Sequence, residues 1–222
     1  MALQLTKQRQ DYGMLSDRTR MRMVERLRQA GIHDERVLAA MFEVQRHLFV
    51  DQALATRAYD DVSLPIGLAQ TISQPLTVAR MTELLFANRP AGKILEIGTG
   101  CGYQTAVLLK MGATVYSIER IGALLDKARK NLRAAKLVQA RLVHGDGHFG
   151  LAEAAPFDGI IMTAAAKSIP EALLAQLAEG GRLIMPMGDG EQHLWHIEKT
   201  SQGLQKTKLD AVKFVPLLPG RG

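Results

Sequence analysis

The feature that most constrains the fold of this chain is a short apolar run that breaks into three alternating glycines and then continues as a helix-forming sequence. The run covers residues 93–97, the glycines are Gly98, Gly100 and Gly102, and the helical pattern covers 103–111. Glycine tolerates positive φ and lets a ligand approach the main chain without meeting a Cβ atom. The first N–H groups of a helix can bind that ligand. The pattern therefore predicts a buried strand, a tight turn and a helix that together bind a nucleotide-like molecule.

The spacing of the glycines distinguishes two kinds of nucleotide ligand. A dinucleotide fingerprint reads Gly-x-Gly-x-x-Gly, with a small sixth residue that lets helix and strand pack closely. Here the sixth position is Tyr103, and Glu96 stands two residues before the first glycine. This arrangement resembles motif I of class I S-adenosylmethionine-dependent methyltransferases, whose cofactor carries an ammonium group that favours a nearby carboxylate. The resemblance implies that Glu96, Gly98, Gly100 and Gly102 bind S-adenosylmethionine, and an ordinary tight turn is the alternative.

Two later acidic residues fall where the same site would need them. Glu119 ends a second strand-like run about 20 residues beyond the turn, where a carboxylate accepts the ribose hydroxyls of a nucleotide. Gly145-Asp146-Gly147 follows a third such run, and its carboxylate can accept a hydrogen bond from an adenine amino group. Alone, Glu119 would suit NAD equally well, and Gly-Asp-Gly is most often only a turn. Taken together, Glu119, Asp146 and Gly147 are expected to bind adenosine.

From residue 93 onward, short apolar runs alternate with helical patterns, which is typical of βαβ units and a mostly parallel sheet. We expect an α/β fold with a Rossmann-like, doubly wound sheet. Two strand-like runs around Gly203 predict an antiparallel hairpin at the C-terminal end of the sheet. The expected strands cover residues 93–97, 114–119, 140–144, 157–163, 181–186, 193–199 and 209–217, and the expected helices cover 103–111, 121–135 and 169–179.

A helical extension and a long loop precede this core. Ser16-Asp17 and Asp34 can cap two amphipathic helices, and Pro75 suits the first turn of a third. Residues 58–75 show no clear periodicity, and a loop of this length in a compact domain is usually functional. We expect one methyltransferase domain over 1–222, with N-terminal helices and the substrate loop in 1–75 and the Rossmann-like core with its hairpin in 76–222.

Composition and charge narrow the class of protein. Hydrophobic residues make up 47% of the 222 residues and charged residues 23%, as in ordinary globular proteins. We expect a cytoplasmic protein without a membrane partner, because no apolar run approaches the length that spans a bilayer and residues 1–10 lack the apolar core of a signal peptide. The single cysteine, Cys101, has no partner for a disulfide or a metal site, so no metal is expected.

The formal net charge of +6 lies largely in the first part of the chain. A basic stripe can indicate nucleic-acid binding, but no aromatic residues interleave these cations as a base-stacking platform would require. We interpret the stripe as a solvated helix face and do not expect a nucleic-acid partner. The basic residues concerned are Lys7, Arg9, Arg18, Arg20, Arg22, Arg26 and Arg28.

A second motif, Gln70-Thr71-Ile72-Ser73-Gln74-Pro75, narrows the superfamily to one family. With it, the chain closely resembles the protein-L-isoaspartate (D-aspartate) O-methyltransferases, repair enzymes that act on isomerised aspartyl residues. The chain departs from the usual pattern at Gln45, at Leu68-Ala69 and at Leu76. The resemblance covers residues from about 37 to 217, and its other segments are 40–41, 46–50, 96–105, 145–147, 157–166 and 214–217.

The resemblance implies a reaction and a set of roles. A substrate carboxylate attacks the methyl carbon of S-adenosylmethionine and gives a methyl ester and S-adenosylhomocysteine. An ordinary carboxylate has a pKa of about 4 and is ionised near pH 7, so catalysis is mainly positioning. We expect Ser73 to be the catalytic residue that hydrogen-bonds the isoaspartyl α-carboxylate, with the Ile72 and Ser73 backbone placing it and Val215 pairing with substrate main chain. Thr71 and Ile72 are expected to contact the cofactor, and a helix cap is the alternative role for Ser73.

Three other functions remain open from the sequence. A class I methyltransferase acting on RNA or a small molecule is favoured by the basic N-terminus but disfavoured by residues 70–75. An NAD-linked oxidoreductase is disfavoured by Tyr103. A cofactor-binding protein without catalysis is kept open by the changes at Leu68, Ala69 and Leu76. We expect a monomer whose partners are isoaspartyl-containing proteins and peptides, with D-aspartyl residues as a second candidate substrate.

Overall fold

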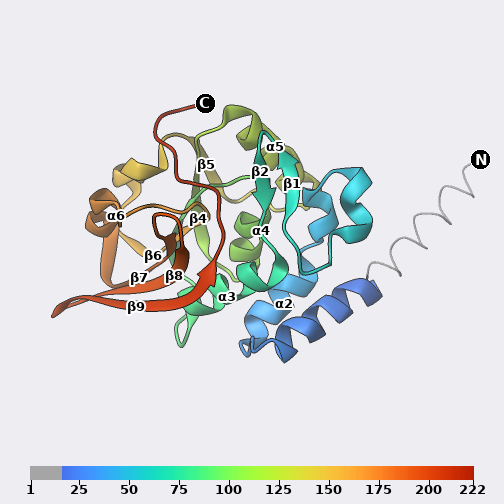
Figure 1. Cartoon of the computed structure of the whole chain (residues 1–222), viewed down its shortest axis with the longest axis horizontal. Helices are drawn as coiled ribbons and strands as arrows, with labels where there is room; N and C mark the ends of the chain where they lie inside the picture. The colour runs from blue at the N-terminus through green and yellow to red at the C-terminus, as the bar shows by residue number, and fades with distance from the viewer. Residues whose placement is uncertain (1–16) are drawn as a thin grey trace, which may run out of the picture.

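The computed structural model describes residues 17–222 as a seven-stranded sheet flanked by helices, with a separate two-stranded hairpin (Figure 1). The strands are β1 Leu64–Gly67, β2 Gln70–Ile72, β3 Lys93–Ile97, β4 Thr114–Glu119, β5 Arg141–His144, β6 Phe157–Met162, β7 Leu177–Met187, β8 Gln192–Thr200 and β9 Gly203–Val212. A helix over 17–29 precedes α2 Glu35–Glu43, α3 Pro75–Phe86, α4 Tyr103–Lys110, α5 Gly122–Ala134 and α6 Glu171–Gln176. Short 3-10 helices are η1 Arg46–Phe49, η2 Gln52–Arg57, η3 Gly147–Phe149 and η4 Ala152–Ala154.

The large sheet has the strand order β5-β4-β3-β6-β7-β8-β9. The strands from β5 to β7 in this order run parallel, and β8 and β9 are antiparallel to their neighbours. The predicted α/β fold with an antiparallel hairpin at its end is confirmed. The order reverses beside β3, so the carboxyl ends of β3, β4 and β6 meet at the switch point where ligands bind in such sheets.

The two faces of the sheet are covered by different helices. Ile94 of β3 packs in one cluster with Leu85 of α3 and Leu108 of α4. Leu95, the next residue, packs on the opposite face with Leu173 of α6. This alternation follows from the two-residue period of a strand, and it directs the next side chain, at position 96, toward the face that α4 covers.

The hairpin at the end of the sheet begins earlier than the sequence pattern indicates. Its second strand covers 203–212 and not the predicted 209–217. Beyond Val212 the chain leaves the edge of β8 and returns to the carboxyl end of β6, where the N–H of Ala165 donates to the carbonyl of Val215. Residues 213–217 therefore line the site instead of extending the sheet.

Residues 58–75 are more regular than their lack of periodicity predicts. They contain the β1-β2 hairpin, in which Leu64 pairs with Ile72. Its turn residues, Leu68 and Ala69, have φ of 53° and 56°. Two-residue hairpin turns with positive φ normally use Asn or Gly, so the sequence carries no signal for this turn.

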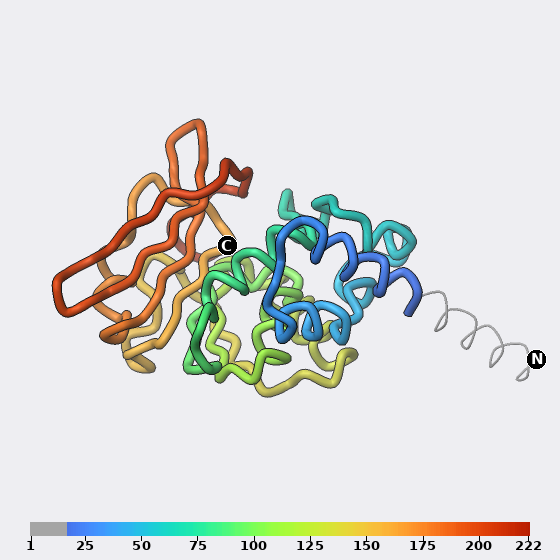
Figure 2. Tube along the Cα trace, turned by 90° about the horizontal axis from the view of Figure 1, so that it is seen from below, coloured from blue at the N-terminus to red at the C-terminus, as the bar shows by residue number. Residues whose placement is uncertain are grey.

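The N-terminal helices pack directly against the core. Met23 of the helix over 17–29 and Val37 of α2 lie in one hydrophobic cluster with Tyr103 of α4 and Leu124 of α5. Figure 2 shows these helices at one end of the molecule and the β8-β9 hairpin at the other. Among residues 17–222, no helix combines the length and the apolar character needed to cross a membrane.

The ends of the N-terminal helices follow the predicted capping in part. Asp34 caps α2, since its side chain accepts a hydrogen bond from the N–H of Arg36. Ser16 lies outside the described residues, as do Lys7 and Arg9 of the basic stripe. Within the stripe, Arg20 pairs with Asp17.

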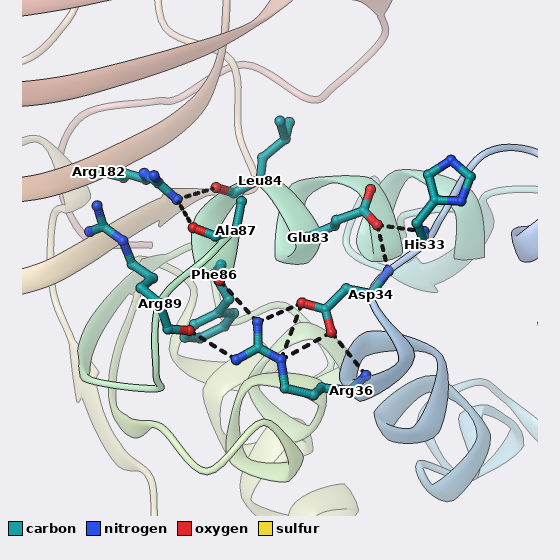
Figure 3. Close-up of polar contacts among 9 residues, drawn as sticks. All are labelled: His33, Asp34, Arg36, Glu83, Leu84, Phe86, Ala87, Arg89 and Arg182. Carbon is teal, nitrogen blue, oxygen red and sulfur yellow. Dashed lines mark hydrogen bonds and ion pairs between the residues drawn. The ribbon is translucent and has the colours of Figure 1, made fainter.

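The C-terminal end of α3 is held by arginine side chains from two elements (Figure 3). Arg36 donates to the carbonyl of Phe86 at 3.1 Å, and Arg182 of β7 donates to that of Ala87 at 2.6 Å. On the neighbouring turn, Glu83 accepts hydrogen bonds from the N–H groups of His33 and Asp34. Cations satisfy the free carbonyls at a helix C-terminus and favour its negative dipole end. These contacts fix α3, whose other end reaches the site.

Candidate active site

The glycine turn joins β3 to α4 at the carboxyl edge of the sheet. Gly98, Gly100 and Gly102 have φ of 95°, 56° and 90°, in the left-handed region that favours glycine. A Cβ atom at Gly98 would lie 2.4 Å from Oγ1 of Thr163, which donates to the carbonyl of Gly98 at 2.7 Å. Gly102 is the N-cap of α4 and packs against Leu132 of α5. The turn therefore requires glycine for its backbone shape and, at Gly98, also for its close packing.

Glu96 lies beneath the turn rather than in the open site. Its side chain is fully buried, and Oε2 accepts hydrogen bonds from Thr105 Oγ1 at 2.5 Å and Ser117 Oγ at 2.6 Å. Oε1 is buried without a hydrogen-bond partner among the described residues. Burial raises the pKa of Glu96 to about 7, against the two hydroxyl donors that lower it. The sequence placed this carboxylate beside the ligand, whereas the structure places it where it supports the start of α4.

Glu119 lies at the end of β4, as predicted, and closes the glycine turn. Its Oε2 accepts the N–H of Gly100 at 2.8 Å, and its Oε1 accepts the N–H of Ile121 at 2.9 Å. The side chain lines a cavity at the carboxyl edge of the sheet together with Thr71 and Gly147. We call this cavity the adenosine cleft, and its other lining residues include Gln70, Gly98, Gly100, Arg120, Val215 and Leu217.

Asp146 lies beside this cleft and is bonded on both oxygens. Oδ1 accepts the N–H and the ring Nδ1 of His148, and Oδ2 accepts the N–H of Gly220 at 2.6 Å. Burial raises the pKa of Asp146, but these donors outweigh it and hold the pKa below its ordinary value. Gly222 continues the same segment, donating to the carbonyl of Arg120 at 2.7 Å. Leu217 and Leu218 thus line the cleft, and the residues that follow them bond to Asp146 and Arg120.

A second, smaller cavity lies between the glycine turn and the start of α3. It is lined by Ile72, Ser73 and Thr163, by Cys101 of the turn and by Tyr103 of α4. We call it the methyl cavity. It lies between the adenosine cleft and the region where a second substrate can enter. Burial raises the pKa of the Cys101 thiol to about 11, which favours the protonated thiol near neutral pH.

An open groove meets the methyl cavity at Ser73 and runs between α3 and the chain after β9. Asp61, Thr77, Lys213 and Val215 line it with Ser73. We call it the substrate groove. Thr71 and Thr163 line this groove, the methyl cavity and the adenosine cleft, so the three spaces adjoin one another.

Ser73 is not the cap of α3. The N-cap residue is Gln74, which makes no side-chain cap bond, and Pro75 occupies the first turn as predicted. The N–H of Leu76 instead donates a hydrogen bond of 2.8 Å to Oδ1 of Asp61, which lies in the loop before β1. Within residues 17–222 the hydroxyl of Ser73 makes no hydrogen bond, and it remains available to a ligand.

The structure brings the predicted residues to one edge of the sheet, with differences in depth. Gly98, Gly100, Glu119, Gly147, Thr71, Ile72, Ser73 and Val215 line the connected spaces, whereas Glu96 and Gly102 support the turn from behind. Sequence reasoning missed Asp61 and Thr163. Thr163 directly follows β6, which pairs with β3, and its place at the carboxyl end of a parallel strand was the signal that could have found it.

Comparisons with known proteins identify the family. The family model described as protein-L-isoaspartate(D-aspartate) O-methyltransferase matches residues 18–222. The protein-L-isoaspartate O-methyltransferase of Chromobacterium violaceum is 77% identical over 222 residues, which is 100% of both chains. That of Dechloromonas aromatica is 58% identical over 209 residues, covering 94% of this chain and 97% of the relative.

Two solved structures share the fold. One, described as a protein-L-isoaspartate O-methyltransferase, has a TM-score of 0.82 at 26% identity and covers 89% of this chain and 65% of its own. The other is a protein of the same description from Plasmodium falciparum in complex with S-adenosyl-L-homocysteine, with a TM-score of 0.76 at 28% identity over 88% of this chain and 96% of its own. The resemblance carried by residues 70–75 is confirmed, and the chain belongs to the protein-L-isoaspartate(D-aspartate) O-methyltransferase family.

Proposed function

We propose that this protein transfers the methyl group of S-adenosylmethionine to the α-carboxylate of L-isoaspartyl residues in damaged proteins. The observation that carries the proposal is the Ser73 hydroxyl, which lies where the substrate groove meets the methyl cavity and has no hydrogen-bond partner within residues 17–222. Membership of the family supports the reaction. The relative from Plasmodium falciparum, in complex with S-adenosyl-L-homocysteine, supports the cofactor.

The residues around the adenosine cleft fit an adenosine group. Glu119 presents carboxylate oxygens at the end of β4 for the ribose hydroxyls. Asp146 and Gly147 flank the adenine position, and Asp146 can accept the adenine amino group while it holds Gly220, because a carboxylate offers about four lone pairs. In this proposal Thr71 contacts the cofactor in the adenosine cleft and Ile72 contacts it in the methyl cavity.

The glycine turn supports the remainder of the cofactor. Gly98 and Gly100 expose main chain to both cavities, and Gly102 begins α4 behind them. We assign Glu96 a role through Thr105: its buried carboxyl group fixes the first turn of α4 beneath the ammonium position. When bound, S-adenosylmethionine supplies a methyl group attached to a positively charged sulfur.

The substrate groove orients the carboxylate. Ser73 donates its hydroxyl hydrogen bond to one carboxylate oxygen, and the Ile72 and Ser73 backbone sets the distance to the methyl cavity. Val215 lines the groove, and we propose that its main chain pairs with substrate main chain. Lys213 has no ion pair among residues 17–222 and adds positive charge to the groove. The Ser73 hydroxyl and the Val215 main chain suit a carboxylate on an extended chain, and Lys213 balances the charge of Asp61 in the groove.

The reaction then needs little further chemistry from the protein. A carboxylate with a pKa of about 4 is ionised at neutral pH and needs no general base. The carboxylate oxygen forms its bond to the methyl carbon as the carbon–sulfur bond breaks, and the products are a methyl ester and S-adenosylhomocysteine. Correct orientation of the two reactants can supply about 7 to 11 kcal/mol in favourable cases.

Two matched peptides test the function. They have one sequence and differ only in an aspartyl or isoaspartyl linkage, and each is incubated with the protein and methyl-labelled S-adenosylmethionine. We expect base-labile label on the isoaspartyl peptide alone. A third peptide with a D-aspartyl residue tests the second candidate substrate. Equal labelling of the aspartyl and isoaspartyl peptides, or no labelling of either, would contradict the proposed function.

We also propose that residues 1–222 act as a single domain and a monomer in the cytoplasm, on isoaspartyl-containing proteins and peptides. Nucleic acid is a poor candidate partner because three arginines of the basic stripe, Arg20, Arg26 and Arg28, make polar contacts within the protein. Arg26 donates to the carbonyl of Tyr59, and Arg28 pairs with Glu25 and Glu35. Light scattering after gel filtration, cell fractionation and an RNA-binding assay test these points separately.

A further inference from the structure

Arg46 is the largest fully buried side chain among the described residues, and the reaction outlined above does not use it. It begins η1, between the N-terminal helices and the loop that leads to the substrate groove. Burial lowers the pKa of its guanidinium, because a charged group loses its hydration inside the protein. A buried cation is costly unless it is well bonded, so its contacts indicate what it does.

The guanidinium of Arg46 holds both ends of a short segment, residues 58–62. Nε donates to the carbonyl of Ala58 at 2.7 Å, and Nη2 lies 3.4 Å from the carbonyl of Val62. Between them lies Asp61, whose Oδ1 accepts the N–H of Leu76 at 2.8 Å at the start of α3. The segment therefore connects Arg46 to the helix that begins two residues after Ser73.

The same guanidinium also contacts the cofactor side of the site. Its central carbon lies 4.7 Å from the centre of the Tyr103 ring, which packs edge-on against Phe49. Tyr103 begins α4 directly after the glycine turn and lines the methyl cavity with Ser73. Arg46 is thus placed between the segment that supports the catalytic serine and the turn that supports the cofactor.

We propose that Arg46 is a positioning residue that sets the distance and angle between Ser73 and the methyl cavity. It acts through residues 58–62 and Asp61 on one side and through the Tyr103 ring on the other. The planar guanidinium suits this role because it can bond two carbonyls and stack on an aromatic ring at once. An arginine serving only as core filling would affect folding but would not change how fast a folded, cofactor-loaded molecule transfers methyl groups. This inference rests on the proposed function.

The test compares Arg46→Met, Arg46→Lys and Arg36→Met with the wild-type protein. Arg36 is a matched control because its guanidinium also donates to two main-chain carbonyls, those of Phe86 and Arg89, but at the far end of α3. For Arg46→Met we expect kcat for the isoaspartyl peptide to fall about 100-fold, as for a displacement of about 1 Å. The dissociation constant of S-adenosylhomocysteine, measured by calorimetry, should change less than about threefold, because the adenosine cleft is untouched.

Arg46→Lys should recover about tenfold of the lost kcat, because an ammonium can bond one carbonyl but lacks the planar fork. Arg36→Met should lower the melting temperature while kcat stays at the wild-type value. The proposal is overturned if either Arg46 variant keeps wild-type kcat, or if kcat and S-adenosylhomocysteine affinity fall together. If Arg46→Met does not fold, Arg46→Lys alone decides between these results.

Hydrogen exchange gives a readout that does not depend on activity. In Arg46→Lys the amide of Leu76 should exchange faster than in the wild type, while that of Gly100, held by Glu119, should not change. Unchanged exchange at Leu76 would overturn the link through Asp61. If the wild-type protein labels neither peptide, the proposed function fails, and the exchange data still decide whether Arg46 orders the segment.

Discussion

The two halves of this active site are built in different ways. The cofactor half is a turn with glycines at positive φ, and the side-chain carboxylate of Glu119 closes it by accepting the N–H of Gly100. The substrate half is a loop whose shape depends on the side chains of Arg46 and Asp61, which belong to no turn motif. One half is recognisable from its glycine motif and the other is held by side-chain contacts that no motif marks, so we expect substitutions in the two halves to have different effects.

Glycine substitutions give the largest expected contrast. Gly98→Ala forces a side chain into the left-handed region and within 2.4 Å of Oγ1 of Thr163. We expect the free energy of unfolding to fall by about 2 to 4 kcal/mol, from backbone strain and overpacking together. Gly180→Ala is the matched control, since Gly180 has φ of +71° but nothing within 4 Å of its added Cβ atom. Urea denaturation of both variants measures the difference, and equal losses would show that the packing at Gly98 is unimportant.

The pH dependence of stability tests the buried support of the turn. Burial raises the pKa of Glu96 from 4.5 to about 7 in the folded protein. Between these values the folded state binds more protons than the unfolded state, so stability falls as pH rises from about 4.5 to 7. Relative to Glu96→Gln, the wild-type protein should lose up to about 3 kcal/mol over this range. Parallel stability profiles for the two proteins in urea titrations would contradict the burial of an ionisable carboxylate.

Removing charge from Glu119 should affect the cofactor half alone. Glu119→Gln weakens the proposed ribose contacts and the bond to Gly100, each a hydrogen bond to a charged group. Such bonds contribute about 1.5 to 3 kcal/mol, so the dissociation constant of S-adenosylhomocysteine should rise about 10- to 100-fold. Calorimetry measures it, with the exposed Glu153→Gln as control. An unchanged dissociation constant would remove Glu119 from the ribose site.

The smallest expected effect on stability is at the β1-β2 turn of the substrate half, and its sign is opposite to that at Gly98. Ala69 occupies the β1-β2 turn with φ of 56°, a conformation that glycine adopts without strain. Ala69→Gly should therefore stabilise the protein by about 1 kcal/mol and raise the melting temperature by about 2 to 4 °C. A lower melting temperature in a thermal scan would indicate that the alanine side chain makes contacts that outweigh the strain.

The same contrast explains how much the sequence could predict. The strand over 93–97, the glycine turn and the acid at the end of β4 follow from local patterns, and the structure places them as predicted. The β1-β2 hairpin could not be predicted, because Leu68 and Ala69 are not residues that mark a two-residue turn. Helix capping by Asp61 could not be predicted either, since the acid lies 15 residues before the N–H that it bonds.

The sequence also could not predict which side chains are buried and which face the site. Glu96 belongs to the motif that predicts the cofactor, but the two-residue period of β3 turns it toward α4 and away from the cleft. The apolar alternation of residues 213–217 predicts a strand. In the structure this segment instead folds back and hydrogen-bonds to Ala165. In both cases the packing of neighbouring elements, which local patterns do not contain, decides which side chains meet the ligand.

The most direct test of the account is methyl transfer by Ser73→Ala with the cofactor site saturated. We expect kcat for the isoaspartyl peptide to fall about 10- to 100-fold, because one hydrogen bond to a charged group is lost. The affinity for S-adenosylhomocysteine and the melting temperature should stay near their wild-type values, because the hydroxyl bonds nothing within residues 17–222. Wild-type kcat in this variant would contradict the assignment of Ser73 as the residue that orients the substrate carboxylate.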